Sequence, residues 1–283
     1  MRKAIFVLSL VFVLTAVYFS GIKAAQMQIF TDETASSSSP VRFGLGIDAA
    51  FTTLSMGAVN SWISDTVDNI GGSVSSSNIN SGYLVDASFN IMLTAVPGLS
   101  FGPKIGYLGA FPGNIKSTGY FYDNYTDDYD YYGTLTWDLY GSMIPVLIGA
   151  SYNYHIPDTI LTLGGSFYFG AAFAHTEIKS TFSGAALNGT DQQLYNFDVP
   201  YSGSCPMVDI TANIGLALSE SFKLLLNLGY RVATVSQMTA DQTQLGTALG
   251  DINAGDTAKD WNNNTLVFDY SGFILGAEAD FTF

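Results

Sequence analysis

Apolar and polar residues alternate with a period of two along most of the chain after residue 40, which is the pattern of β-strands with one apolar face. In the first such segment, apolar residues occupy the odd positions from Val41 to Phe51, and small or polar residues occupy most of the even positions. The alternation recurs along the chain. It predicts eight strands, at about 41–52, 82–93, 99–107, 141–154, 161–173, 208–216, 222–231 and 272–283.

The connections between these strands alternate in length. Short turns are expected at 96–98, 156–159 and 219–221, and long loops at about 58–80, 111–134, 178–205 and 236–265. Short turns on one side and long loops on the other are the layout of a transmembrane β-barrel. The sequence therefore predicts an all-β fold, a transmembrane up-and-down antiparallel β-barrel of eight strands. A ten-stranded barrel results if 180–205 or 236–265 contains another hairpin.

The residue types on the polar face indicate which face points outward. A water-facing surface is rich in Lys, Glu and Arg, whereas this face is mostly Gly, Ser, Ala, Thr and Asn. Small residues suit the narrow lumen of an eight-stranded barrel, so we expect the apolar face to contact lipid. The alternative is a soluble barrel with an apolar interior.

Two places depart from the pattern. Pro103 and Pro145 fall within strands and have no N–H to donate, so a bulge or irregular pairing is expected at each. The phase of the alternation also shifts between Leu139 and Ile144, which predicts a bulge near Gly141 at the start of the fourth strand.

The first 24 residues have the composition of a secretory signal peptide: a basic start, an apolar run and a small-residue exit. Cleavage after Ala24 or Ala25 fits about equally, and an uncleaved anchor is the alternative. Residues 25–40 are polar and aperiodic and are expected to form a flexible lead-in, followed by the barrel domain at 41–283. The leader implies export across the inner membrane, and with a barrel fold it predicts the bacterial outer membrane.

Composition and charge narrow the function. The chain has 283 residues, of which 48% are hydrophobic and 12% charged, and its formal net charge is −14. Such an acidic chain does not bind nucleic acid through a basic patch. The single cysteine, Cys205, cannot form an intrachain disulfide, and no Cys/His cluster indicates a zinc site. We expect no cofactor and no metal.

The C-terminal pattern resembles that of known outer-membrane proteins. Leu275, Ala277, Ala279, Phe281 and Phe283 alternate up to a final Phe, which is similar to the signal by which such barrels are recognised for insertion. The segment 145–154 also resembles a strand of the opacity and OmpW-like families. Over about Val41 to Phe283, the chain therefore resembles small outer-membrane β-barrels of the OmpA/OmpX/OmpW (opacity-like) type. The resemblance implies insertion by the barrel-assembly machinery and contact with outer-membrane lipid and lipopolysaccharide.

Charged residues on the inward face are expected to pair, because an isolated charge in a narrow lumen is costly. We predict an internal charge network that closes the lumen, and a gated ion path is the alternative. By parity, the network comprises Arg42, Asp48, Asp86, Lys104, Asp209, Lys223, Arg231, Glu278 and Asp280.

The second long loop combines tyrosines with carboxylates, a composition suited to binding a partner surface. An acidic loop that is merely solvated is the alternative. The candidate recognition residues are Tyr120, Tyr122, Tyr125, Asp127, Asp128, Asp130, Tyr131 and Tyr132. The segment 251–256 resembles part of a calcium loop but lacks the downstream glutamate.

No catalytic constellation is apparent. The two histidines are His155, beside a short turn, and His175, with Glu177 two residues on. A general base needs an oriented partner and a nucleophile or water within reach, and no sequence pattern supplies them. We therefore expect a structural and surface-recognition protein without enzymatic activity, binding a possible cell-surface ligand. The alternative is a porin-like narrow channel for small or hydrophobic solutes, as the OmpW resemblance implies.

Overall fold

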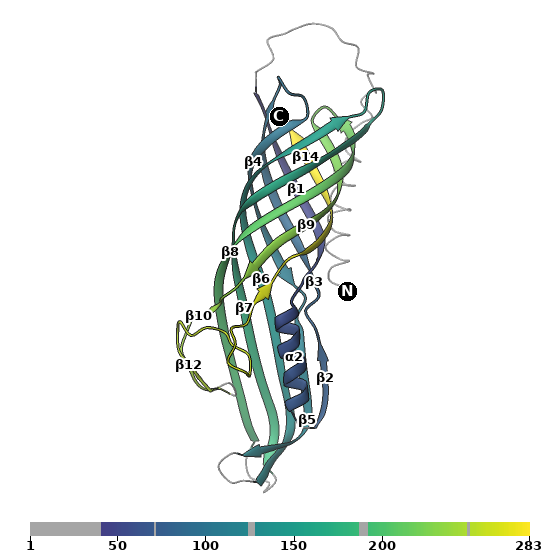
Figure 1. The fold of residues 1–283 in the computed structure, drawn as a ribbon. Helices are drawn as coiled ribbons and strands as arrows, with labels where there is room; N and C mark the ends of the chain where they lie inside the picture. The colour runs from purple at the N-terminus through teal and green to yellow at the C-terminus, as the bar shows by residue number, and fades with distance from the viewer. Residues whose placement is uncertain (1–40, 71, 124–127, 187–191, 248–249) are drawn as a thin grey trace.

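The computed structural model describes residues 41–70, 72–123, 128–186, 192–247 and 250–283, and in these residues it is an antiparallel β-barrel (Figure 1). The expected leader at 1–24 and lead-in at 25–40 lie outside the described residues. Eight strands close the ring, because the last of them pairs with the first. In ring order they are β1 (Val41–Thr53), β3 (Ser81–Leu93), β4 (Leu99–Ala110), β6 (Asp128–His155), β7 (Leu161–Ala186), β8 (Gln192–Ser219), β9 (Phe222–Val235) and β14 (Gly272–Thr282). The predicted eight-stranded barrel is confirmed.

The period of two places apolar side chains on the outside of this ring. Consecutive residues show the alternation: Ile47 is 47% exposed and Asp48 only 4%, and Leu228 is 61% exposed beside Asn227 at 3%. Phe, Tyr, Leu, Ile and Val therefore cover the outer surface of the ring. The inward positions carry the small and polar residues, as the parity of the sequence predicted.

Three strands continue far beyond the ring on the side of the long connections. β6, β7 and β8 have 28, 26 and 28 residues, whereas β1 and β14 have 13 and 11. β5 (Gly113–Asp123) follows β4 along the same edge of β6, and β2 (Ser73–Ser77) pairs with β5. Beyond the ring, β2, β5, β6, β7 and β8 thus form an open wall, here called the outer wall (Figure 1). Three segments expected to be long loops, 58–80, 111–134 and 178–205, are largely regular structure instead.

A helix, α2 (Gly57–Asn69), lies beside this wall (Figure 1). Val59, Trp62, Ile63 and Thr66 recur at the spacing of one helix face, and all four are buried. On its other side, Asn60 makes two hydrogen bonds with the backbone of Ile79, one donated and one accepted, at 3.1 and 2.9 Å. This helix is too short and too polar to span a bilayer, and no other helix of the described ranges has the length and hydropathy to do so.

The fourth long connection contains short strands that close over the outer end of the ring. They are β10 (Thr239–Ala240), β11 (Gln244–Thr247), β12 (Gly250–Ile252) and β13 (Phe268–Asp269). β10 pairs with β8 and β13 with β9, whereas β11 and β12 form a separate hairpin. No strand of this connection enters the ring, so the ten-stranded alternative is wrong for the described residues.

The bulge expected near Gly141 is absent from the described pairing, because β6 and β7 pair in one register from Tyr131 to His155. Leu139 is buried and points inward; the apparent phase shift arose because apolar residues line the interior here. At Pro103 and Pro145 the register is also unchanged. The β3–β4 ladder skips the pairs of Pro103 and its neighbour Gly102, and the β4–β6 ladder skips the pairs of Pro145 and its neighbour Ile144. Pro103 and Pro145 lack the N–H that a ladder bond requires, so the pairing is interrupted there without a bulge.

Candidate functional site in the barrel interior

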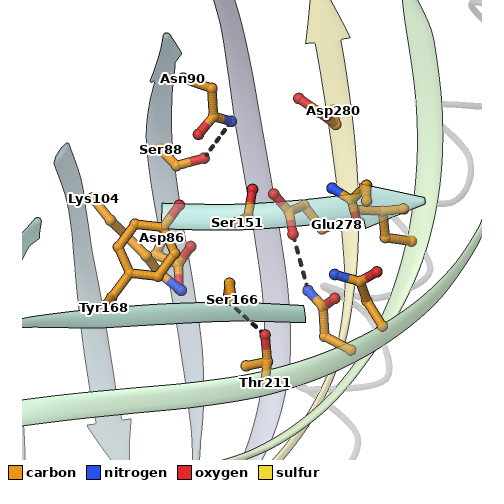
Figure 2. Close-up of a pocket in the computed structure, with 14 residues that line it drawn as sticks. Asp86, Ser88, Asn90, Lys104, Ser151, Ser166, Tyr168, Thr211, Glu278 and Asp280 are labelled. Carbon is orange, nitrogen blue, oxygen red and sulfur yellow. Dashed lines mark hydrogen bonds and ion pairs between the residues drawn. The ribbon is translucent and has the colours of Figure 1, made fainter. Parts of the chain in front are cut away.

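The interior is polar in the half of the ring near the short turns. Side chains from seven of the eight strands surround one cavity there (Figure 2), whereas β1 contributes Gly44 and Gly46 near this level. The cavity has a volume of about 20 Å³, which leaves room for one or two water molecules. Its lining residues are Asp86, Ser88, Asn90, Lys104, Ser151, Asn153, Ser166, Tyr168, Thr211, Asn213, Leu225, Asn227, Glu278 and Asp280.

Two buried ion pairs cross this region. Lys104 Nζ lies 3.0 Å from Asp86 Oδ2 and 5.2 Å from the centre of the Tyr168 ring. Arg231 donates two hydrogen bonds to Asp209, at 2.9 and 3.3 Å, and both side chains are essentially inaccessible to solvent. Asp209 and Arg231 are directly opposite on β8 and β9. The register of two adjacent strands therefore fixes the second pair.

The carboxylates of Asp48, Glu278 and Asp280 have fewer hydrogen-bond and ion-pair partners than those of Asp86 and Asp209. Asp48 lies directly opposite Glu278 on β14 and Asp86 on β3, so three carboxylates occupy one row across adjacent strands. Glu278 accepts a hydrogen bond of 3.1 Å from Asn227. One carboxylate oxygen of Asp48 and one of Asp280 have no hydrogen-bond donor among the described residues. Like charges directly opposite each other repel, so this row needs compensation.

The structure places seven of the nine residues predicted for the charge network inside the barrel. Arg42 is exposed at the end of β1, and Lys223 is half-buried next to Asp280 on the neighbouring strand. Both keep the inward parity predicted from the sequence, but neither is enclosed, because each lies at the short-turn end of its strand. The expected continuous network is instead two discrete ion pairs and a row of carboxylates.

The other half of the interior is apolar, so the expectation of a polar lumen throughout is wrong. Beyond this half, on the outer wall, the three tryptophans of the chain stack, Trp62 on Trp137 at 5.6 Å and Trp137 on Trp261 at 6.0 Å between ring centres. Trp261 Nε1 donates to Thr66 Oγ1 at 2.7 Å, which ties the fourth long connection to α2. The hydrophobic cluster that runs through this half of the ring and along the wall includes the buried residues Leu108, Met143, Ala172, Ile178, Val199, Tyr201, Met207, Val235, Met238 and Tyr270.

The tryptophan cluster was missed by sequence reasoning because its members come from a helix, a strand and a loop far apart in the chain. The asparagines Asn90, Asn213 and Asn227 were recognised as inward-facing but not as a group. A signal was present, since each lies a few residues from a short turn on the polar face of its strand.

The described part of the tyrosine-rich segment belongs to the paired strands β5 and β6. Tyr120 and Tyr132 are opposite each other, are 58% and 50% exposed, and pack edge to face with their ring centres 5.0 Å apart. Tyr125 and Asp127 lie outside the described residues. Tyr122, Asp128, Asp130 and Tyr131 belong to the paired strands.

The outer surface of the wall brings His175 close to Ser202 and Asp241. Ser202 Oγ donates to Asp241 Oδ2 at 2.8 Å, and His175 Nδ1 lies 3.5 Å from that hydroxyl and 3.7 Å from the carboxylate. In a nucleophile–base–acid relay the two partners contact different nitrogens of the imidazole. Here both approach Nδ1, so the carboxylate competes for the hydroxyl proton. His155 is exposed beside its turn.

Within the described ranges, no three His, Cys, Asp or Glu side chains gather closely enough to hold a metal by themselves. The chemistry that the interior offers is therefore that of scattered carboxylates and neutral oxygen acceptors. Hydroxyls and amides outnumber charged groups around the cavity.

Comparisons with known proteins identify no family: no family model matches the chain, and no curated protein matches it. Solved structures align over most of its length. Neisserial surface protein A is 11% identical and covers 85% of this chain and 97% of its own, with a TM-score of 0.30. The attachment invasion locus protein of Yersinia pestis is 9% identical over 85% and 97%, with a TM-score of 0.28. The outer membrane protease OmpT of Escherichia coli is 13% identical over 89% and 99%, with a TM-score of 0.32. Superpositions this loose carry no inference about function.

Proposed function

We propose that this chain is a bacterial outer-membrane β-barrel protein with a sealed interior, whose outer wall presents a recognition surface outside the membrane. The observation that carries the proposal is the continuous band of apolar side chains on the outside of a closed ring. In a closed ring every strand has a neighbour on each side, which is the condition for a sheet to span lipid.

The height of the band fits a bilayer. On β7 the outward apolar residues run from Leu161 to Phe173, and polar His175 and Glu177 follow. Thirteen residues at about 3.3 Å each, tilted by about 40°, span about 30 Å, close to the thickness of a hydrocarbon core. Aromatic pairs flank the band, Tyr230 with Phe273 at one edge and Phe222 with Phe281 at the other, as interfacial girdles do.

The filled interior favours a sealed barrel over the channel alternative. The polar half holds a cavity of about 20 Å³, and the apolar half is filled by buried side chains such as Leu108, Met143 and Tyr270. Steady conduction through eight strands requires a continuous aqueous path, which the packed side chains do not provide. Within the described ranges, no open path through the ring supports an OmpW-like route for small or hydrophobic solutes.

Recognition by the outer wall is supported by its length and by its exposed aromatics. β6 has 28 residues, about 90 Å of strand, of which a bilayer needs only about a third to a half. The strand pair carrying Tyr120 and Tyr132 lies on this extension. Outer-membrane lipid, lipopolysaccharide and the barrel-assembly machinery are the partners we propose, with a cell-surface ligand at this strand pair.

We propose no enzymatic role. The triangle of His175, Ser202 and Asp241 lacks the order of a relay. The His175→Ala and Ser202→Ala proteins should therefore behave as the unaltered chain in every binding and permeability assay, and loss of a hydrolytic activity in both would contradict this.

The deciding experiment uses residues 25–283 refolded in detergent. We expect a compact species on a gel that shifts on boiling, strand-rich circular dichroism and no steady conductance in planar bilayers. A chain that remains soluble without detergent and shows no shift would overturn the membrane assignment. Steady conductance of a folded species would instead support the channel alternative.

A further inference from the structure

The buried interior has more negative than positive groups. The described strands bury Asp48, Asp86, Asp209 and Asp280, and Glu278 also faces inward, whereas the buried cations are Lys104 and Arg231. Counting half-buried Lys223, five carboxylates face three cations, a deficit of two positive charges. Charges in a low-dielectric interior need a partner, so something else must compensate this deficit.

Neutral oxygens also converge on the cavity without donors. The amide oxygens of Asn90, Asn213 and Asn227 have no hydrogen-bond partner among the described residues, and their side chains are 4%, 8% and 3% exposed. The Oδ1 atom of Asp280 also has no hydrogen-bond partner among the described residues, and this residue is 5% exposed. All four residues line the cavity.

The orientation of two of these amides is fixed by their nitrogen atoms. Asn90 Nδ2 donates to Ser88 Oγ at 3.2 Å, and Asn227 Nδ2 donates to Glu278 Oε2 at 3.1 Å. Because the nitrogen is used in each case, the oxygen is the atom left for another partner. Figure 2 shows the bond between Asn90 and Ser88 and the bond that Glu278 accepts.

Glycines create the space in which such oxygens approach one another. A Cβ at Gly46 would lie 2.5 Å from Ser88 Oγ and 2.6 Å from Glu278 Oε1. A Cβ at Gly164 would lie 2.3 Å from Asn153 Oδ1 and 2.9 Å from Asn213 Oδ1. At both positions a side chain would displace oxygen atoms that now face the interior.

We propose that this cavity, the lumen site, binds one hard divalent cation, with Ca²⁺ as the best match. One divalent ion supplies the two missing charges. Calcium accepts six to eight oxygens, including amide oxygens and water, in irregular geometry. Magnesium requires a regular octahedron and retains its waters, for which the cavity is too small. Since three carboxylates do not gather at one point, amides complete the coordination, with Glu278 and Asp280 as the charged ligands.

The test measures Ca²⁺ binding to the refolded full-length barrel in detergent, by titration calorimetry and by the thermal unfolding midpoint after chelation. We expect one ion per chain and a saturable rise of the midpoint, since a ligand of the folded state stabilises it. Mg²⁺ and Na⁺ at matched ionic strength should give much smaller shifts. Asp280→Asn and Asn213→Leu should each weaken Ca²⁺ binding by about tenfold or more.

Two controls make the result decisive. Thr162→Val removes a buried lumen hydroxyl that does not line the cavity, and it should leave binding unchanged. Asp256→Asn alters the surface segment 251–256, and loss of binding in that variant would place the ion on the surface and overturn the lumen site. Absence of a saturable Ca²⁺ effect would also overturn it, and stabilisation by lower pH in place of Ca²⁺ would show that protons compensate the carboxylates.

Discussion

Removing one member of the Arg231–Asp209 pair should destabilise the barrel severely. Arg231 is 0% exposed and Asp209 1%, and two hydrogen bonds join them. The pair lies where the polar half of the lumen meets the apolar half, and both side chains are closed to solvent, so bulk water does not replace a lost partner. Leaving one buried charge alone costs about 3–5 kcal/mol, which is roughly a 100- to 4,000-fold change in the unfolding equilibrium.

The assay is a double-mutant cycle with Arg231→Met, Asp209→Leu and the double variant. Urea unfolding in detergent, followed by strand circular dichroism and by the heat-modifiable gel shift, gives the free energy of each. Both single variants should lose about 3–5 kcal/mol. The double variant should lose far less than the sum, because apolar residues of similar volume replace a buried pair at little cost.

A matched exposed pair provides the control. Lys179 Nζ lies 3.0 Å from Glu177 and 3.3 Å from Asp198, but the lysine side chain is 42% exposed. Lys179→Met should therefore leave the unfolding curve almost unchanged. The reasoning is refuted if Arg231→Met is as mild as Lys179→Met, or if the two single losses add in the double variant.

Three further predictions test other parts of the molecule. Trp62→Ala removes the ring that packs α2 on Trp137 of the wall, at a cost of about 3–5 kcal/mol. The helix should then be cleaved by protease within 57–70, while the heat-modifiable gel shift of the barrel persists. A helix that stays uncleaved would contradict this prediction. Leu228→Lys, on the outer band, should cost about 2–4 kcal/mol in lipid, whereas Leu245→Lys on the β11–β12 hairpin, 72% exposed, should cost little; equal effects would place the band in water. Hydrogen bonds from Asn264 lower the pKa of Asp260 below its ordinary value of 3.8, so their contribution is present above about pH 4 and is lost as the pH falls through the lowered pKa. The fluorescence of adjacent Trp261 should change in that acidic range, and the Asp260→Asn protein should not show this change.

The sequence alone predicted the eight-stranded ring, but it did not predict the apolar half of the interior or the outer wall that extends beyond the ring. Alternation along segments such as Val41–Phe51 reports one local property, the side of a strand to which each residue points, and this property determines a barrel wall. Where the interior is apolar, as at Leu139 and Met143, both faces of β6 are mixed, and the period of two no longer separates inside from outside.

The same limit explains the missed site features. The tryptophan stack depends on Trp261 contacting α2, which lies about 200 residues earlier in the chain, and the row of Glu278, Asp48 and Asp86 depends on the register of three strands. Register is set by turn lengths and by the packing of the whole ring, so a single strand does not encode it. Inward parity placed these carboxylates in the lumen but gave no information about which of them are adjacent.

The seam between β1 and β14 has a consequence for the order of folding. It pairs Gly44 with Thr282, whereas β7 pairs with β8, which begins only six residues after β7 ends. The entropy of closing a loop of more than 200 residues opposes the seam until the strands between are assembled. The β7–β8 hairpin should therefore form early and the seam last, and until it forms both edge strands expose unpaired backbone groups. A folding intermediate of this barrel is thus an open sheet whose two edges require temporary cover by another strand.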